Sequence, residues 1–201
     1  MNNAEIIAKG QKYCLNVFNR LPIAMVRGEG SYVFDADGNK YLDFVSGIAV
    51  NALGHAHPYV AAALAEQATQ LIHSSNLYWI EPQVRLAEVL VENSAFDKVF
   101  FGNSGAEANE GALKLARKYA IYKGRPERQQ VITMNSSFHG RTLATLTATG
   151  QEKMHQGFEP LAAGFTYVPF NDWPALQAAV SEQTCAIMLE PVQGEGGVFP
   201  A

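Results

Sequence analysis

Residues 98–122 read KVFFGNSGAEANEGALKLARKYAIY, and their pattern indicates the fold class. Residues 98–101 are predicted to form a short apolar strand, and residues 102–105 supply the glycines of a tight turn. Apolar residues at helical spacing predict a helix from that turn through Tyr122. Its apolar stripe consists of Ala112, Leu113, Leu115, Ala116, Tyr119 and Ala120. The stretch therefore predicts a strand that leads through a glycine turn into a helix.

The alternation of strand and helix continues along the chain. Residues 130–134, 165–168 and 185–189 are predicted strands, and residues 143–149 and 173–180 are predicted helices. Strands that alternate with helices favour right-handed crossovers between parallel strands. We therefore expect an α/β fold with a mainly parallel sheet and helices on both of its faces.

The first part of the chain has a different character. In order, its predicted elements are a helix at 4–19, strands at 24–27, 31–35 and 40–44, and helices at 58–71 and from residue 81. Asp37 and Gly38 supply the turn residues of a hairpin. We expect residues 1–50 to form a small α+β segment and residues 51–201 to form the first part of a larger domain.

Composition excludes several classes of protein. The chain has 201 residues and a formal charge of -4, with 48% hydrophobic and 17% charged residues. Fibrous, disordered and disulfide-stapled proteins have other compositions, and this charge gives no reason to expect nucleic acid or an anionic membrane as a partner. The sequence lacks the apolar run of a membrane helix and the order of a signal peptide. We expect a cytoplasmic protein whose two cysteines are reduced.

Three loops that follow predicted strands carry candidate chemistry, because ligands of such sheets bind at the carboxyl ends of the strands. In the first loop, residues 102–107, small residues at a helix amino terminus let backbone amides approach a phosphate. Ser104 could instead be only the N-cap of that helix. The dinucleotide fingerprint and the Walker loop are both absent.

The second loop, residues 136–142, places an aromatic ring, an imidazole and a guanidinium within four positions. Such a set can stack on a ligand and bind a carboxylate with a planar fork, although each side chain could also be purely structural.

The third loop, residues 190–197, places carboxylates before a glycine run. It could orient a ligand or form an acidic surface turn. His55 and His57 lack the further ligands of a metal site, so no metal is expected.

Four motifs together resemble the class III aminotransferases, which use pyridoxal 5'-phosphate on the fold-type I scaffold. They are NSGAEANE at 103–110, SFHGRT at 137–142, EPVQGEGG at 190–197, and GIAV at 47–50 followed by LGHAHP at 53–58. The resemblance covers essentially the whole chain. It implies that residues 1–50 belong to a small domain and that residues 51–201 begin the large cofactor-binding domain.

The resemblance implies a role for each candidate residue. Cofactor-binding residues would be Ser104, Gly105, Ala106, Phe138, His139 and Glu190. The first three would hold the phosphate, Phe138 would stack on the pyridine ring, and Glu190 would order the polar network beneath it. Arg141 would bind the α-carboxylate of the substrate. Glu195 would pair with a distal arginine and release it when 2-oxoglutarate arrives.

The implied activity is transfer of the amino group of N2-acetyl-L-ornithine to 2-oxoglutarate, in arginine biosynthesis, by a homodimer. Ornithine, succinylornithine and 4-aminobutyrate remain alternative amino donors, and a non-catalytic protein that binds a phosphorylated ligand remains an alternative of another class. No lysine of this sequence lies in a motif that matches the Schiff-base lysine of the family. We therefore expect that lysine beyond Ala201 and read the 201 residues as the amino-terminal half of the enzyme.

Overall fold

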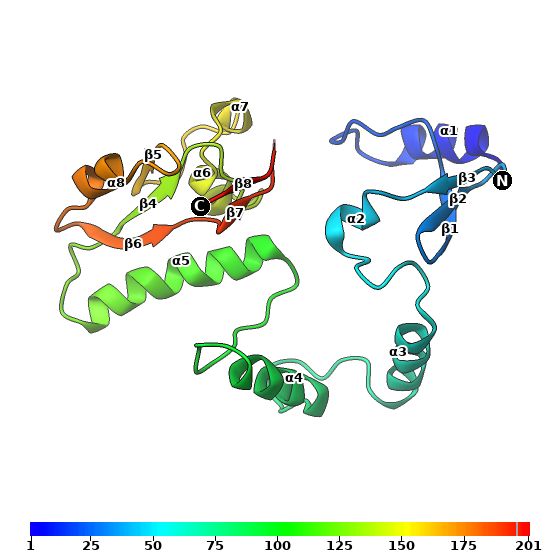
Figure 1. Ribbon diagram of the computed structural model, residues 1–201, viewed down its shortest axis with the longest axis horizontal. Helices are drawn as coiled ribbons and strands as arrows, with labels where there is room; N and C mark the ends of the chain where they lie inside the picture. The colour runs from blue at the N-terminus through cyan, green and yellow to red at the C-terminus, as the bar shows by residue number, and fades with distance from the viewer. Residues whose placement is uncertain (196) are drawn as a thin grey trace. The chain divides into compact units, whose positions relative to one another are not determined.

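The structure is a computed structural model that describes residues 1–195 and 197–201. The chain divides into two compact units, Met1–Gln83 and Val84–Ala201 (Figure 1). Helix α4, Glu81–Glu92, begins in the first unit and continues into the second.

The first unit is built on a small antiparallel sheet. Its strands are β1 (Met25–Glu29), β2 (Tyr32–Asp35) and β3 (Lys40–Leu42), in the order β1-β2-β3. The hairpin predicted at Asp37 and Gly38 is confirmed, because β2 and β3 pair antiparallel on either side of it. The helices are α1 (Asn3–Tyr13), α2 (Ser46–Ala49) and α3 (Pro58–Gln70).

Helix α1 is shorter than the predicted helix at 4–19. It begins with a capping box in which the Asn2 side chain accepts from the Glu5 amide, at 2.9 Å, and it ends at Tyr13. Leu15, Val17 and Phe18 are exposed, so no packing supports further helical turns.

The second unit contains the predicted parallel sheet. Its central strand β4 (Gln130–Met134) pairs parallel with β5 (Phe165–Val168) and with β6 (Thr184–Met188), which gives the order β5-β4-β6. The main helices are α5 (Gly105–Tyr122), α6 (Leu143–Ala148) and α8 (Trp173–Ala179). The short elements α7 (Glu152–His155), β7 (Val192–Gln193) and β8 (Phe199–Pro200) complete the unit.

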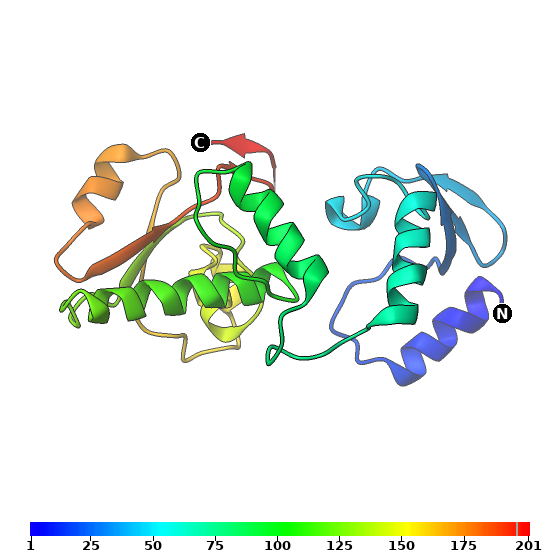
Figure 2. The ribbon, with the colours of Figure 1, turned by 90° about the horizontal axis from the view of Figure 1, so that it is seen from below.

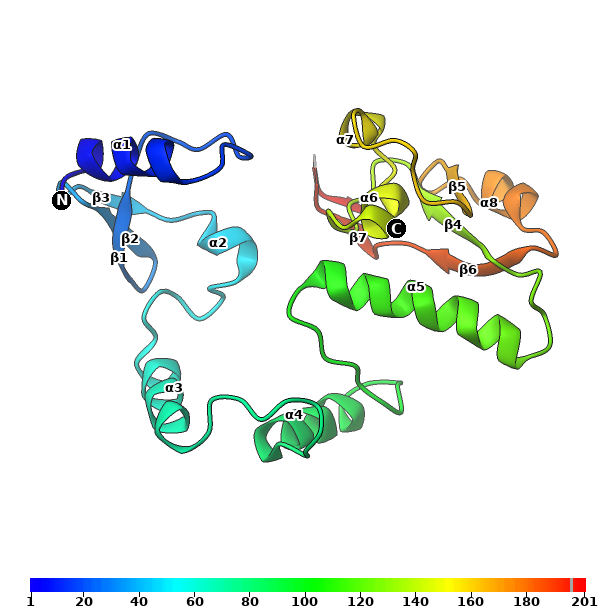
Figure 3. The ribbon, with the colours of Figure 1, turned by 180° about the vertical axis from the view of Figure 1, so that it is seen from behind.

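Helices cover both faces of this sheet, as predicted. On one face Ile132, Met134 and Val168 pack against α8, which contributes Leu176 to this contact. On the other face the Tyr167 hydroxyl donates to the carbonyl of Thr147 in α6, at 2.6 Å. Helix α5 runs along the sheet, with Leu113 and Ala120 buried (Figures 2 and 3). The sheet therefore lies between α8 and the pair α5 and α6.

The prediction of a strand at residues 98–101 is wrong, because these residues form no strand. A β-strand needs a neighbour that accepts and donates its backbone hydrogen bonds, and no described strand pairs with this segment. The Phe100 ring lies instead against Gly111 of α5, where an added Cβ would come within 2.8 Å of the ring. Apolar character alone did not supply a pairing partner.

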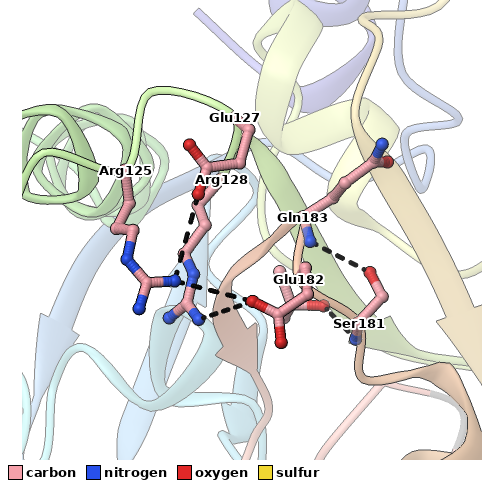
Figure 4. Close-up of polar contacts among 7 residues, drawn as sticks. Arg125, Glu127, Arg128, Ser181, Glu182 and Gln183 are labelled. Atoms are coloured by element: carbon pink, nitrogen blue, oxygen red, sulfur yellow. Dashed lines mark hydrogen bonds and ion pairs between the residues drawn. The ribbon is translucent and has the colours of Figure 1, made fainter.

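A cluster of charged side chains lies at the end of the sheet where β4 and β6 begin (Figure 4). The Glu182 carboxylate lies 3.5 Å from a guanidinium nitrogen of Arg125 and 3.5 Å from one of Arg128. Because both arginines precede β4 and Glu182 precedes β6, these ion pairs join the starts of the two strands. The three candidate loops follow the opposite ends of the strands or begin α5.

Candidate active site

The first loop ends in a capped helix amino terminus. The Ser104 hydroxyl accepts from the Glu107 amide at 3.2 Å, and the Glu107 carboxylate accepts from the Asn103 amide at 2.5 Å. The first intrahelical bond runs from the Ala108 amide to the Ser104 carbonyl, at 3.0 Å. The amides of Gly105 and Ala106 therefore stand at the open, positive end of α5. Ser104 is an N-cap, and its own hydroxyl proton remains available for a ligand.

Gly105 leaves room beside this helix end. An added Cβ at Gly105 would meet nothing within 4 Å, and its backbone does not lie in the left-handed region. Neither crowding within the chain nor backbone conformation therefore requires glycine at this position. The open space would let an external group approach the backbone closely, so the residues present fit a bound phosphate.

The second loop packs directly on the amino terminus of α5. The side-chain amide of Asn109 donates to the carbonyl of His139 at 2.8 Å. Gly140 has φ +134°, and an added Cβ would lie 2.8 Å from the Cβ of Ala106. The Thr142 hydroxyl donates to the Glu110 carboxylate. These contacts bring residues 136–142 to the open end of α5.

The third loop joins the same cluster. The Glu190 carboxylate accepts from the Phe138 amide at 3.2 Å, and the Gln193 side chain donates to the Asn135 carbonyl at 2.9 Å. Burial raises the pKa of Glu190 and the nearby Glu195 adds to this, whereas the hydrogen bond from Phe138 opposes it. The three loops predicted from the sequence therefore meet at one place.

The predicted ligand contacts of the second and third loops differ in exposure. Phe138 is half-buried, and the Arg141 guanidinium is exposed and lies 5.7 Å from the centroid of the Phe138 ring. Glu195 is exposed, and Gly196 lies outside the described residues. An aromatic face beside a free guanidinium can hold a flat ring and a carboxylate at the same time.

His139 lies differently from its neighbours in the sequence, because its side chain is buried. Its Nε2 atom lies 3.1 Å from the hydroxyl of Thr133 on β4, and its amide donates to the Thr149 hydroxyl at 2.9 Å. Burial lowers the pKa of His139, so the imidazole is neutral at neutral pH. The imidazole thus faces the sheet, and the residue anchors the loop.

Sequence reasoning missed the residues that hold the loops together. Asn109 and Glu110 lie one turn after Gly105 on α5, and Gln193 lies inside the third motif. The sequence does contain a signal for Asn109 and Glu110, because polar side chains one helical turn from a candidate anion site can reach the same loop cluster. Thr133 gave no signal, because a threonine within an apolar strand is common.

Within residues 1–195 and 197–201, no group of three or more His, Cys, Asp or Glu side chains could hold a metal ion. His55 lies with its Nε2 atom 2.6 Å from the carboxylate of Asp43. Over the same described residues, no helix is both long and apolar enough to cross a membrane.

A parallel sheet, a helix amino terminus and three loops that converge on it define an α/β protein whose loop cluster can accept an anionic ligand. A family model described as aminotransferase class-III matches residues 15–201. The chain belongs to the class-III aminotransferase family.

Individual relatives agree with this assignment. The acetylornithine aminotransferase of Caldanaerobacter subterraneus subsp. tengcongensis is 59% identical over 196 residues, which are 98% of this chain and 50% of the relative. The chain therefore spans about half the length of that relative.

Two solved structures are similar to the chain. The ornithine aminotransferase of Toxoplasma gondii, solved with partial occupancy of pyridoxal phosphate at its active site, has a TM-score of 0.93 and 32% identity; the match covers 99% of this chain and 47% of that one. The N-acetylornithine aminotransferase of Stenotrophomonas maltophilia has a TM-score of 0.77 and 40% identity, over 97% of this chain and 47% of that one.

Proposed function

We propose that the enzyme containing this chain transfers the amino group of N2-acetyl-L-ornithine to 2-oxoglutarate, with pyridoxal phosphate as cofactor. The observation that carries the proposal is the convergence of the three loops on the open end of α5. Family membership and the acetylornithine aminotransferase that is 59% identical support the reaction type and the amino donor. We also propose that it works as a cytoplasmic homodimer in arginine biosynthesis.

The cofactor phosphate is assigned to the first loop. The amides of Gly105 and Ala106 would donate to it, together with the Ser104 hydroxyl, at the positive end of the helix. The Phe138 ring would stack on the pyridine ring. When bound, pyridoxal phosphate supplies an electron sink for the charge that develops at the substrate Cα atom.

Substrate recognition is assigned to the exposed charges of the second and third loops. Arg141 would bind the α-carboxylate with its planar fork, next to the ring of Phe138. Glu195 would respond to the second carboxylate of 2-oxoglutarate. Glu190 would hold the backbone of Phe138, since its carboxylate already accepts from that amide.

We propose a domain division at residues 50 and 51. Residues 1–50 contain α1 and the antiparallel sheet and would belong to a small domain. Residues 51–201 contain the parallel sheet and the three loops and would form the first part of the cofactor-binding domain. This boundary lies inside the compact unit Met1–Gln83, and the change from paired antiparallel strands to helices and parallel strands supports it.

The amino donor is tested by comparing donors on the gene product that contains residues 1–201. With 2-oxoglutarate as acceptor, we expect kcat/KM for N2-acetyl-L-ornithine to exceed the values for ornithine, succinylornithine and 4-aminobutyrate. Ornithine is the second candidate, because the ornithine aminotransferase structure has the higher TM-score of the two compared. A preference for another donor would correct the substrate, and no transfer from any donor would reject the function.

The phosphate site is tested by Gly105→Ala. An added Cβ would meet nothing within 4 Å apart from neighbouring residues and the backbone of its own helix, so the melting temperature should not fall, but the methyl group occupies the space assigned to the phosphate. We expect the Kd for pyridoxal phosphate to rise roughly 5- to 150-fold, as for a steric cost of about 1–3 kcal/mol. Gly10→Ala in α1, which also meets nothing within 4 Å, is the matched control. Equal cofactor affinity in both variants would place the phosphate elsewhere.

A further inference from the structure

A group of buried polar side chains lies beneath the second loop, between the end of β4 and α6. Thr133, Ser137 and Thr149 are fully buried, and His139 is only 5% exposed. Polar groups at such depth are stable only when their hydrogen bonds are satisfied. Their contacts therefore determine which atom carries each proton.

The proton of Thr133 can be assigned from its neighbours. Its Oγ1 atom lies 2.8 Å from the carbonyl oxygen of Ala148 and 3.1 Å from Nε2 of His139. A carbonyl oxygen cannot donate, so the single hydroxyl proton of Thr133 goes to Ala148. The contact with His139 is then a hydrogen bond only when Nε2 carries a proton and donates to Thr133.

The contacts of Ser137, the remaining neighbour of Thr133, agree with this assignment of the Thr133 proton. The Ser137 hydroxyl accepts from the Gly150 amide at 3.0 Å and lies 3.5 Å from Oγ1 of Thr133. Its own proton is thus free to point at Thr133, whose oxygen has a second lone pair. One donated bond and two accepted contacts use the full capacity of the Thr133 hydroxyl.

His139 is held at three points. Its ring is held by Thr133, its amide donates to the Thr149 hydroxyl at 2.9 Å, and its carbonyl accepts from Asn109 at 2.8 Å. Because Phe138 precedes His139 directly, anchoring both the ring and the backbone of His139 restrains the backbone that carries the proposed stacking ring. Gly140 separates His139 from Arg141, which follows on the same loop.

We propose that Thr133 is a positioning residue for amino transfer: its hydroxyl holds His139 as the Nε2–H tautomer and so sets the direction in which Phe138 and Arg141 face the ligand. This inference rests on the proposed function, because Phe138 and Arg141 are the ligand contacts proposed there. Thr133 itself is fully buried and acts through His139.

The kinetic test compares valine and serine at position 133 in the gene product that contains residues 1–201, loaded with pyridoxal phosphate. Thr133→Val keeps the shape and removes the hydroxyl. We expect KM for N2-acetyl-L-ornithine to rise ~10-fold with kcat changed less than about twofold, because substrate orientation and not chemistry is affected. Thr133→Ser restores the hydroxyl and should return KM to the wild-type value. An unchanged KM in Thr133→Val would overturn the inference.

The matched control is Thr147→Val. Thr147 is 2% exposed, and its hydroxyl also has one donated and one accepted bond, to the Leu143 carbonyl at 2.8 Å and from the Ala162 amide at 3.1 Å. It lies on α6, and the two hydrogen-bond partners of its hydroxyl, Leu143 and Ala162, lie outside the second loop. We expect a similar loss of stability with KM unchanged. An equal rise of KM in both variants would show a purely structural effect and overturn the positioning role.

The tautomer is tested independently of activity. In protein labelled with ¹⁵N-histidine, correlation spectra distinguish Nε2–H from Nδ1–H, and His139→Gln identifies the signal. We expect Nε2–H in the wild type and its loss in Thr133→Val. Nδ1–H in the wild type would overturn the inference, even if the valine variant does not accumulate. A wild type that transfers no amino group rejects the proposed function, and the tautomer result then decides the Thr133–His139 contact by itself.

Discussion

Gly140 shows how a single residue sets the shape of the candidate site. It lies next to Arg141, and its φ of +134° belongs to the region that glycine favours. An added Cβ would lie 2.6 Å from the Thr145 hydroxyl and 2.8 Å from the Cβ of Ala106. The second loop can therefore approach the end of α5 only because this position has no side chain.

Gly140→Ala should move the second loop away from α5. The strained backbone and the clash with Ala106 together should cost about 1–3 kcal/mol, which corresponds to roughly 5- to 150-fold weaker pyridoxal phosphate binding. Gly124→Ala is the matched control, because Gly124 also has a positive φ, +71°, but an added Cβ would meet nothing within 4 Å. Cofactor titration of both variants checks the expectation. If both bind the cofactor as wild type does, close approach of the loop is not required.

Arg141 is the residue to which substrate recognition is assigned. Arg141→Lys keeps the charge and removes the planar fork, so productive substrate binding should weaken by ~1.5–3 kcal/mol, or roughly 10- to 150-fold in kcat/KM. Arg125→Lys, on the ion pairs at the opposite end of the sheet, should leave the kinetics unchanged. Steady-state kinetics of the enzyme that contains residues 1–201 decide the matter. Unchanged KM and kcat in Arg141→Lys would show that another residue binds the carboxylate.

At the scale of elements, Asp35 joins the parts of the first unit. Ala24 and Asp35 are the buried residues of 1–83, a range that the structure describes completely. The Asp35 carboxylate accepts from the side chains of Asn3 at 2.9 Å, Asn39 at 2.9 Å and Tyr41 at 2.8 Å. One carboxylate thus connects α1, the β2–β3 turn and β3.

The stability of the first unit should depend on pH through Asp35. Burial by itself would raise the pKa of Asp35, but the hydrogen bonds from Asn39, Asn3 and Tyr41 outweigh it and hold the pKa far below its usual range. A carboxyl group with a lowered folded pKa stabilises the protein above its unfolded pKa, about 3.9 for Asp. This stabilisation is lost as the pH falls from that value toward the folded pKa.

Asp35→Asn tests this expectation. The variant should melt at a lower temperature than wild type near pH 7, and the gap should shrink below about pH 4, where wild-type Asp35 begins to lose its contribution. Thermal melts followed by circular dichroism at several pH values provide the measurement. Two melting curves that stay a constant interval apart across this range would show that the charge of Asp35 does not stabilise the unit.

The elements also show where sequence reasoning stops. Residues 130–134 and 165–168 were predicted as strands with the bounds that the structure gives them, because each is a short apolar run between turn signals. Residues 98–101 have the same character and form no strand, since a strand also needs a paired neighbour. Local pattern predicts the capacity to form a strand, and pairing decides whether one forms.

At the scale of the whole molecule, three lysines of the second unit, Lys114, Lys118 and Lys153, lie outside the three candidate loops. Lys114 and Lys118 are exposed on α5, and Lys114 is nine residues beyond Gly105, or about 13 Å along the helix axis. Lys153 lies on the short helix α7. None of these three belongs to the loops that meet at the end of α5.

Because no lysine of residues 1–201 lies in a motif that matches the Schiff-base lysine of the family, borohydride reduction should attach pyridoxal phosphate to a lysine outside this range. The enzyme that contains these residues is loaded with the cofactor, reduced, digested and analysed by mass spectrometry. We expect stoichiometric labelling of one lysine and only trace labelling of the exposed lysines. A stoichiometric label on a lysine within 1–201 would contradict the assignment.

Local sequence patterns predicted the types of the main elements, the parallel sheet and the three loops that carry candidate chemistry. They could do so because periodicity, turn residues and helix caps are properties of neighbouring positions. Only the tertiary structure decided that His139 faces Thr133, that Asp35 joins α1 to β3, and which side chains tie the loops together. The contacts Asn109–His139, Glu190–Phe138 and Gln193–Asn135 join residues 30, 52 and 58 positions apart. Such contacts depend on how packed elements bring distant residues together, and no local pattern specifies this.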